Sequence, residues 1–281
     1  MTTLGDAKKK ALNKFIEAKI VDKHYELISI FSYSLGKSEL DIVMEDKVIL
    51  EQNQLINLDK NINRRISGEP LSYITNNKKF YNEEFYINNK VLVPRFETEE
   101  LIDFFLKLVK KENTKNKKLL DIGTGSGVIS LIIEKEIPNL KIYAIEKSKE
   151  AFEVAKTNME NKESKIKLTL EDIKNSKLNN INFVVSNPPY IKSDIIQKLS
   201  EEVKREPRIA LDGGKNGIKV IEDIFIWEKN VNKNNASIIL IEIDESIMKN
   251  VKELTEKFYF NKKINFIKDL NNNIRFLYIF T

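Results

Sequence analysis

The stretch Leu119–Gly127 restricts the fold of this chain more than any other part of it. Its first half, Leu119-Leu120-Asp121-Ile122, has the apolar pattern of a short buried strand. Glycine permits sharp turns and lets a ligand approach the backbone closely, and the second half is rich in glycine. A strand that turns through glycines into a helix is typical of the ligand-binding end of an open α/β sheet. The turn residues are Gly123, Thr124, Gly125, Ser126 and Gly127.

From residue 118 onward, strand-like and helix-like segments alternate. Short apolar, β-branched runs are followed by longer segments whose apolar residues recur at helical spacing. This alternation predicts the α/β class, with a doubly wound and mostly parallel sheet. We expect strands at 118–122, 141–146, 166–170, 181–186 and 237–242, with two more near 264–268 and 275–280. We expect helices at 127–136, 148–161, 216–230 and 246–258.

The first 75 residues have a purely helical pattern and predict a small helical bundle. Asp22 and Ser38 stand where N-caps are expected, and Gly36 stands where a helix should stop. The apolar residues at helical spacing fall in three segments, at about 12–20, 25–35 and 51–66.

Aromatic and β-branched runs separated by turn residues follow, and they predict a β-hairpin linker over 76–93. A helix is expected to start at Thr98, which has acidic neighbours, and to run to about Lys111. The predicted domains are therefore 1–75, 76–93 and 94–281. The runs of the hairpin region are 79–81, 84–87 and 91–93, with turns at 82–83 and 88–89.

Acidic residues near the predicted strand ends indicate which cofactor the α/β domain binds. Asp121 precedes a G-x-G-x-G turn, where a carboxylate would repel the pyrophosphate of a dinucleotide but would favour a cationic ligand. S-adenosylmethionine (SAM), which carries an ammonium and a sulfonium, fits better than NAD. Glu146 at the second strand end can accept hydrogen bonds from the ribose hydroxyls. Asp172 can hold the adenine amine, with Ile173 against the ring; singly, each acidic residue could also be a solvated surface charge.

Asn187-Pro188-Pro189-Tyr190 follows the predicted strand 181–186 and has the residues of a small clamp. Two prolines lack N–H groups, so nearby carbonyls are free to accept hydrogen bonds from a ligand. Asn187 adds a side-chain acceptor and donor, and Tyr190 adds a flat ring. The clamp suits a planar group that carries an NH₂, such as an amide or the exocyclic amine of a base. The competing interpretation is a simple turn after a strand.

Composition excludes several kinds of site. The 281 residues include no cysteine and one histidine, His24, so disulfides, thiolate metal sites and a His-based triad are not expected, and no metal is predicted. No apolar run is long enough to cross a membrane, and Met1–Lys10 lacks a signal-peptide pattern, so we expect a cytoplasmic protein. Net charge is +5, yet residues 1–75 carry 11 basic and 11 acidic side chains, which disfavours nucleic acid binding there.

These motifs together resemble the HemK/PrmC protein-(glutamine-N5) methyltransferases, and the resemblance covers nearly the whole chain. It implies a SAM-dependent domain of class I with a seven-stranded, mostly parallel sheet, an N-terminal helical domain and a hairpin linker. It implies that the substrate is the glutamine of the Gly-Gly-Gln motif in peptide-chain release factors. The motifs are Arg65 with Gly68-Glu69-Pro70-Leu71, Val93-Pro94-Arg95 with Glu97-Thr98-Glu99, Asp121 to Gly127, Asn187 to Tyr190, Glu206-Pro207-Arg208, Ala210 to Gly214, and Gly217.

The resemblance also implies roles for single residues. Asn187 would bind both substrate and cofactor, and the tetrapeptide Asn187, Pro188, Pro189 and Tyr190 would hold the glutamine amide during methyl transfer. Arg95 is a candidate to order the loop near the substrate, with a plain surface charge as the alternative. Two positions depart from the family pattern, because Phe96 stands at a frequent proline and Asp244 at a usual glycine.

Other functions are compatible with the clamp, and the first hundred residues help to distinguish them. An adenine-N6 or guanine-N2 nucleic-acid methyltransferase could use the same four residues on an unpaired base. A ribosomal-protein glutamine methyltransferase is a second alternative, but Pro94-Arg95-Phe96-Glu97-Thr98-Glu99 favours the release-factor branch. A SAM-binding scaffold protein without turnover would have no need of the clamp. The resemblance of residues 1–100 therefore predicts a protein substrate, with neither nucleic acid nor membrane as a direct partner.

Overall fold

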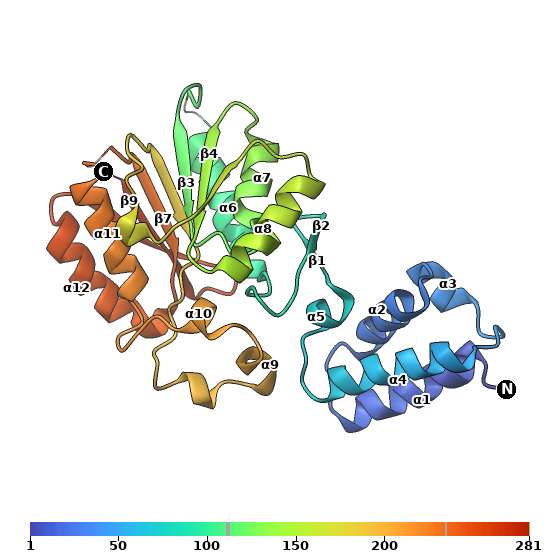
Figure 1. Ribbon diagram of the computed structural model, residues 1–281. Helices are drawn as coiled ribbons and strands as arrows, with labels where there is room; N and C mark the ends of the chain where they lie inside the picture. The colour runs from blue at the N-terminus through green and yellow to red at the C-terminus, as the bar shows by residue number, and fades with distance from the viewer. Residues whose placement is uncertain (111–112, 234, 281) are drawn as a thin grey trace. The chain divides into compact units, whose positions relative to one another are not determined.

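The computed structural model divides the chain into two compact units, shown in Figure 1. The helical unit comprises Met1–Asn77 together with Ser200–Arg205, and the α/β unit comprises the remainder. This division differs from the predicted one at two places. The predicted linker 76–93 is not a separate unit, because the boundary lies between Asn77 and Lys78 and the rest of the linker belongs to the α/β unit. The short segment 200–205 packs with the helical unit although it is distant in sequence. The structure describes residues 1–110, 113–233 and 235–280.

The helical unit is a bundle whose helices begin and end at the residue types expected from the sequence. Thr3 and Ser38 form capping boxes with Asp6 and Asp41, and Gly36 ends a helix at φ +62°. Asp22 occupies its predicted N-cap position, but its side chain makes no capping hydrogen bond. The helices are α1 (Leu4–Glu17), α2 (Lys23–Leu35), α3 (Glu39–Met44), α4 (Gln52–Ile66), α5 (Leu71–Thr75) and, from the distant segment, α9 (Glu201–Lys204).

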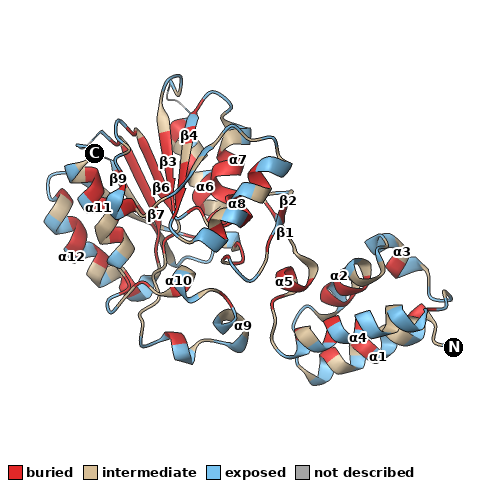
Figure 2. Cartoon of the chain, in the orientation of Figure 1, coloured by how far each residue is buried: buried red, intermediate tan, exposed pale blue. Residues whose placement is uncertain are grey.

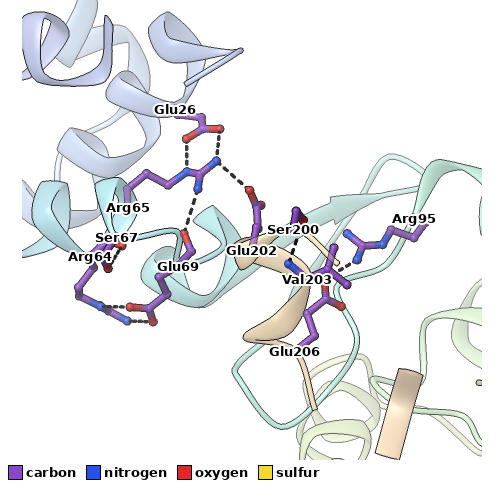
Figure 3. Close-up of polar contacts among 10 residues, drawn as sticks. All are labelled: Glu26, Arg64, Arg65, Ser67, Glu69, Arg95, Ser200, Glu202, Val203 and Glu206. Atoms are coloured by element: carbon purple, nitrogen blue, oxygen red, sulfur yellow. Dashed lines mark hydrogen bonds and ion pairs between the residues drawn. The ribbon is translucent and has the colours of Figure 1, made fainter. Parts of the chain in front are cut away.

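Packing in the helical unit combines an apolar core with buried ion pairs. Leu4, Phe15 and Phe31 are fully buried in the core. Figure 3 shows that Arg65 donates hydrogen bonds to both Glu26 and Glu202. Because a buried guanidinium is costly unless it is paired, these contacts attach segment 200–205 to the bundle.

The predicted hairpin is present but shorter than expected. Strands β1 (Asn77–Phe80) and β2 (Glu83–Tyr86) are joined by Tyr81 and Asn82, both with positive φ, rather than by Asn82-Glu83. The prediction of a strand at Val91–Val93 is wrong. That segment is not assigned to a strand, and Val91 and Val93 are buried, so its apolar residues reflect side-chain packing.

The sheet of the α/β unit has the predicted seven strands in the order β5-β4-β3-β6-β7-β9-β8. The first five of these are parallel, whereas β9 runs antiparallel to both of its neighbours. The strands are β3 (Lys118–Ile122), β4 (Lys141–Glu146), β5 (Lys167–Leu170), β6 (Phe183–Ser186), β7 (Ile238–Glu242), β8 (Lys263–Lys268) and β9 (Ile274–Phe280).

Helices cover both faces of this sheet, so its central strands are buried, as the red ribbon in Figure 2 shows. The main helices are α6 (Phe96–Val109), α7 (Val128–Glu136), α8 (Lys149–Asn161), α11 (Lys219–Asn230) and α12 (Met248–Tyr259), with α10 (Arg208–Leu211) and the 3₁₀ turns η1 (Ile173–Asn175), η2 (Ile196–Lys198) and η3 (Glu245–Ile247) between them. Helices α6, α7 and α8 lie on one side of the sheet, and α11 and α12 lie on the other (Figure 1). No helix in the described ranges combines the length and apolarity needed to cross a membrane.

Three predicted helix starts, at 98, 216 and 246, lie two or three residues from the observed starts of α6, α11 and α12. Helix α6 begins at Phe96 after Arg95, so Thr98 lies inside its first turn rather than at its cap. Its expected end at Lys111 falls outside the described residues, and the helix as described ends at Val109. The shift places the Thr98 hydroxyl on the inner side of the helix, where the side chain is 3% exposed.

The chain reverses its direction of strand order at β3, whose two neighbours are β4 and β6. In parallel sheets, ligands bind at such a switch point, beyond the carboxyl ends of the strands. The glycine turn follows β3 and the Asn187 segment follows β6, so the topology brings the two predicted motifs to one edge.

Candidate active site

A cleft of about 1010 Å³ lies within the α/β unit at the carboxyl ends of its parallel strands. Ten of the predicted site residues line this cleft. These are Gly123, Thr124, Gly125, Ser126, Glu146, Asp172, Ile173, Asn187, Pro188 and Pro189. Four other predicted residues do not line it, namely Arg95, Asp121, Gly127 and Tyr190.

The glycine turn forms one wall of the cleft, and its backbone geometry requires glycine. Gly127 has φ +84°, and a Cβ there would lie 3.6 Å from Ala155 of α8. The amides of Gly123 and Thr124 donate to the Ile145 carbonyl, which ties the turn to the end of β4. Helix α7 can therefore start directly at the turn and pack closely on α8.

Asp121 lies behind this turn and is fully buried. Its Oδ2 accepts hydrogen bonds from Thr124, at 2.6 Å, and from Ser130. Burial raises the pKa of Asp121 to about 6. No donor in the described part of the chain reaches its other oxygen, Oδ1. A buried carboxylate oxygen without a partner fits a cationic group, as the cofactor expected from the sequence would provide.

Glu146 ends β4 and contributes both of its carboxylate oxygens to the cleft wall. Oε2 accepts from the Gly125 amide at 3.0 Å, and Oε1 accepts from the Ser148 amide at 2.9 Å. These bonds fix the carboxylate, and each oxygen retains a lone pair for a ligand hydroxyl. The site therefore fits a ribose at this strand end.

The next strand end supplies a second polar group and an apolar surface. Asp172 follows β5, and its Oδ1 accepts from the Lys174 amide at 3.1 Å to cap η1. Ile173 is buried beside it and lines the cleft. A flat ring with an amine at its edge fits these two neighbours.

The Asn187 segment forms the opposite wall and carries free acceptors. Among the residues that the structure describes, none donates a hydrogen bond to the Asn187 Oδ1 or to the Pro188 carbonyl oxygen. Asn187 Nδ2 instead donates to Thr98 Oγ1 at 3.1 Å. Two acceptors on one wall can hold an NH₂ group and direct its nitrogen into the cleft.

A second loop fixes the backbone of this segment. The Ile191 amide donates to the Leu211 carbonyl at 3.0 Å, and the Gly213 amide donates to the Ile191 carbonyl at 2.8 Å. A Cβ at Gly213 would lie 2.7 Å from the Pro189 carbonyl oxygen. Gly213 is therefore required for the two loops to meet, and the prolines are held from both sides.

Tyr190 turns away from the cleft lining. Its ring packs against the apolar core, and its hydroxyl donates to Glu242 Oε1 at 3.4 Å. Burial raises the pKa of the Tyr190 hydroxyl and raises the pKa of Glu242 to about 7. Contact between the tyrosine ring and a substrate amide remains a prediction.

Arg95 is the N-cap residue of α6 and pairs with the buried carboxylate of Glu206, as Figure 3 shows. The other oxygen of Glu206 accepts from the Val93 amide at 3.2 Å. Arg95 thus orders the segment beside the cleft, next to Pro94, which does line it. Of the two unusual positions, Phe96 is exposed and Asp244 caps η3 and pairs with Arg275 at 3.2 Å.

Sequence reasoning missed several residues of this site. For Thr98 and Glu242 the sequence indicated only a helix start and a strand end. It did not indicate a role in the site, because the partners of both residues are distant in sequence. Asp223 lies on the wall from α11, where an isolated acidic residue gives no signal at all. Further lining residues that were not predicted include Lys90, Val91, Leu92, Pro94, Ile209, Ala210 and Val220.

Two families match this chain in separate regions. The family described as Methyltransferase small domain matches residues 101–214, and the PrmC N-terminal domain matches residues 6–75. These regions correspond to the α/β unit with its cleft and to the helical bundle.

Similar proteins of known name extend over most of the chain. A release factor glutamine methyltransferase of Thermodesulfovibrio yellowstonii is 32% identical over 90% of this chain and 94% of its own length. The protein of that name from Dictyoglomus turgidum is 34% identical over 92% and 91%, respectively. The one from Bacillus subtilis is 30% identical over 98% and 96%.

Solved structures support the fold alone, since their sequence identity is low. The hMettl16 catalytic domain in complex with MAT2A 3′UTR hairpin 6 has a TM-score of 0.56 and 14% identity, covering 70% of this chain and 74% of that one. Human methyltransferase 10 domain containing protein has a TM-score of 0.51 and 16% identity, covering 70% and 88%.

Proposed function

The chain belongs to the release factor glutamine methyltransferase family, and from this premise we propose how its cleft performs the reaction. It is a SAM-dependent enzyme that methylates a glutamine of a peptide-chain release factor. We assign the target atom to the side-chain amide nitrogen, N5, of the glutamine in the Gly-Gly-Gln motif. Because release factors act on ribosomes, a cytoplasmic location is part of this proposal.

The observation that carries the proposal is the pair of free acceptors, Asn187 Oδ1 and the Pro188 carbonyl oxygen. An amide nitrogen is a weak nucleophile because its lone pair is delocalised into the carbonyl. Hydrogen bonds from its NH₂ to two fixed acceptors hold the nitrogen at attacking distance and favour charge on it. The N–H groups become more positive in the transition state, so the acceptors stabilise that state more than the ground state.

The wall formed by the glycine turn and the ends of β4 and β5 is proposed to hold the cofactor. SAM supplies the methyl group from its sulfonium centre. Asp121 would attract its ammonium from behind the glycine turn, Glu146 would bind its ribose, and Asp172 with Ile173 would bind its adenine. The glycine turn, Gly123–Gly127, would let it approach the backbone, and Asn187 joins the two walls.

The remaining residues of the tetrapeptide have conformational roles in this proposal. Pro189 fixes the backbone through its ring and through its contact with Gly213. Tyr190 is anchored at Glu242 with its ring against the apolar core, so contact with the substrate amide would require its ring to turn toward the cleft. Arg95 orders the neighbouring segment through Glu206 and does not itself need to touch the substrate.

Specificity is proposed to come from the helical unit. A glutamine side chain offers few atoms, so the clamp alone cannot select one glutamine among many. A thousandfold preference corresponds to about 4 kcal/mol, which requires a larger contact surface. The helical unit lacks any described part in the cleft and is free to recognise the folded release factor.

The direct test is mass spectrometry of a purified release factor after incubation with this protein and SAM. We expect one added methyl group on the Gly-Gly-Gln glutamine, and a much lower methylated fraction after the same time with Asn187→Ala. Duplex DNA, single-stranded DNA, RNA and a ribosomal-protein mixture are assayed in parallel with labelled SAM. Labelling of a nucleic acid or of ribosomal protein, with no labelling of the release factor, would overturn the assignment.

A further inference from the structure

Three residues from different elements form a chain of hydrogen bonds behind the clamp. Asn187 Nδ2 donates to Thr98 Oγ1 at 3.1 Å, and Thr98 Oγ1 donates to Glu242 Oε2 at 2.8 Å. Asn187 follows β6, Thr98 lies in the first turn of α6, and Glu242 ends β7. Thr98 and Glu242 are 3% and 1% exposed, so water does not compete freely for these bonds.

The direction of this chain follows from the number of protons on each group. An ionised carboxylate only accepts, so Glu242 takes the single hydroxyl proton of Thr98. The Thr98 oxygen is then left as an acceptor, and only the NH₂ end of the Asn187 amide can bond to it. The carbonyl end, Oδ1, must therefore face the cleft, and there no described residue donates to it.

We propose that Thr98 and Glu242 are positioning residues that hold the Asn187 amide in the one orientation able to accept from a substrate NH₂. This inference rests on the proposed function, because the orientation matters only if an NH₂ group is held. An asparagine turned by 180° would present its own NH₂ to the substrate NH₂. Two donors would then face each other, and one of the two acceptors would be lost.

Protonation of Glu242 removes the constraint. A protonated carboxyl group can donate to Thr98 Oγ1, which frees the threonine proton to donate to Asn187 Oδ1. The amide can then adopt the inactive orientation. The charged or titratable groups that face Glu242 are Arg275 from β9, Glu97 from α6, and Tyr190 from the clamp itself.

These neighbours place the protonation of Glu242 within a pH range in which turnover can be measured. Arg275 favours the ionised carboxylate, whereas burial and Glu97 oppose it, and the balance raises the pKa of Glu242 to about 7. Turnover should therefore fall as pH drops below about 7, while the release factor still binds.

The first experiment compares two substitutions at Thr98. Thr98→Val removes the hydroxyl and is expected to lower kcat about tenfold to a hundredfold, with less than a threefold change in KM for the release factor. Thr98→Ser restores the hydroxyl and is expected to recover most of the lost kcat. Thr255→Val, which removes another buried hydroxyl on α12 away from the cleft, is the matched control and should leave kcat unchanged.

The second experiment measures kcat between pH 5.5 and 8.5. Glu242→Gln keeps an acceptor for Thr98 but cannot ionise, so the acidic decline in kcat should disappear. Glu228→Gln alters another buried glutamate, whose pKa burial also raises, and it should keep the decline. The inference is overturned if Glu242→Gln keeps the decline or if Thr98→Val has the same kcat as Thr255→Val.

A third readout does not depend on turnover. In the wild-type protein, the ¹⁵N and ¹H resonances of the Asn187 side-chain NH₂, assigned by their loss in Asn187→Ala, should shift with pH through the titration of Glu242. They should not shift in Glu242→Gln. Absence of methyl transfer to the release factor by the wild type would refute the proposed function, whereas an unshifted NH₂ resonance would refute the positioning role.

Discussion

The helical unit and the α/β unit hold their charged groups in different ways. In the helical unit, Arg65 is buried but is paired with both Glu26 and Glu202. Among the described residues, every carboxyl group whose pKa is raised, chiefly by burial, lies in the α/β unit. These groups are Glu100, Asp121, Asp223, Glu228 and Glu242.

Exposed apolar side chains, in contrast, are concentrated in the helical unit. More than half of the large apolar side chains that are exposed belong to the first 77 residues. Leu40, Val43 and Met44 of α3 are examples, with exposed fractions of 69%, 51% and 73%. The comparison teaches that the α/β unit keeps buried carboxyl groups whose charged form burial disfavours, which is a common property of functional sites. The helical unit pairs its buried guanidinium with two carboxylates and has exposed apolar side chains, as a unit that binds a partner would.

The largest effect is expected where an acceptor of the α/β unit is removed. Asn187→Ala should lower turnover by about 10²–10³-fold, as for loss of one oriented transition-state contact. SAM should still bind, as measured by calorimetry. Asn187→Asp keeps an acceptor and should retain more activity than Asn187→Leu. Equal activity of these last two variants, both folded by circular dichroism, would refute the acceptor role.

Removing the acidic end of β4 should affect cofactor affinity. Glu146→Ala is expected to weaken SAM binding by about 1.5–3 kcal/mol, the scale of hydrogen bonds to a charged group. Titration calorimetry measures this, with Glu160→Ala on the exposed side of α8 as the control. An unchanged affinity in a folded Glu146→Ala protein would remove the ribose assignment.

The raised pKa of a buried carboxyl group in the α/β unit predicts how the free energy of unfolding depends on pH. The pKa of Glu242 is about 7 in the folded chain against an ordinary value of 4.5, so between these values the folded state binds more protons. The free energy of unfolding should therefore fall as pH rises from about 4.5 to 7, by about 3 kcal/mol from this residue. Urea unfolding at several pH values tests this. The fall should be smaller in Glu242→Gln and unchanged in the exposed control Glu253→Gln; identical curves for both variants would contradict the prediction.

The smallest effect is expected on the apolar surface of the helical unit. Replacing Leu40 and Met44 by glutamine and Val43 by threonine should lower kcat/KM for an intact release factor about tenfold, or about 1.4 kcal/mol. A short Gly-Gly-Gln peptide should be methylated equally by both forms. The control replaces Phe260 and Leu270, exposed in the α/β unit, by glutamine. An equal loss on peptide and on intact factor would assign the helical unit to catalysis instead of recognition.

Local pattern predicted the architecture well because local physics determines it. Buried parallel strands require continuous apolar runs such as Phe183–Ser186, and the turn at Gly127 requires a positive φ. The prediction of a strand at Val91–Val93 was wrong because burial by side-chain packing favours the same apolar residue types as a buried strand. Strand ends bring most of the predicted site residues onto the walls of one cleft, and the roles of these residues stay predictions.

Contacts between distant residues could not be predicted. Thr98 and Glu242 are 144 residues apart, and neither position has a local pattern that indicates the other. The same holds for segment 200–205, whose membership in the helical unit depends on the buried guanidinium of Arg65. Only the three-dimensional arrangement shows that these residues meet.

Because segment 200–205 belongs to the helical unit, that unit cannot be completed until late in synthesis. Glu202 leaves the ribosome 137 residues after Arg65, whereas Glu26 has already emerged when Arg65 appears. At about 5–20 residues per second, synthesis of these 137 residues takes roughly seven to thirty seconds, so the bundle lacks its last helix for that time. During that interval the nascent helical unit lacks its final ion pair, and β3 to β6 are made before it is complete.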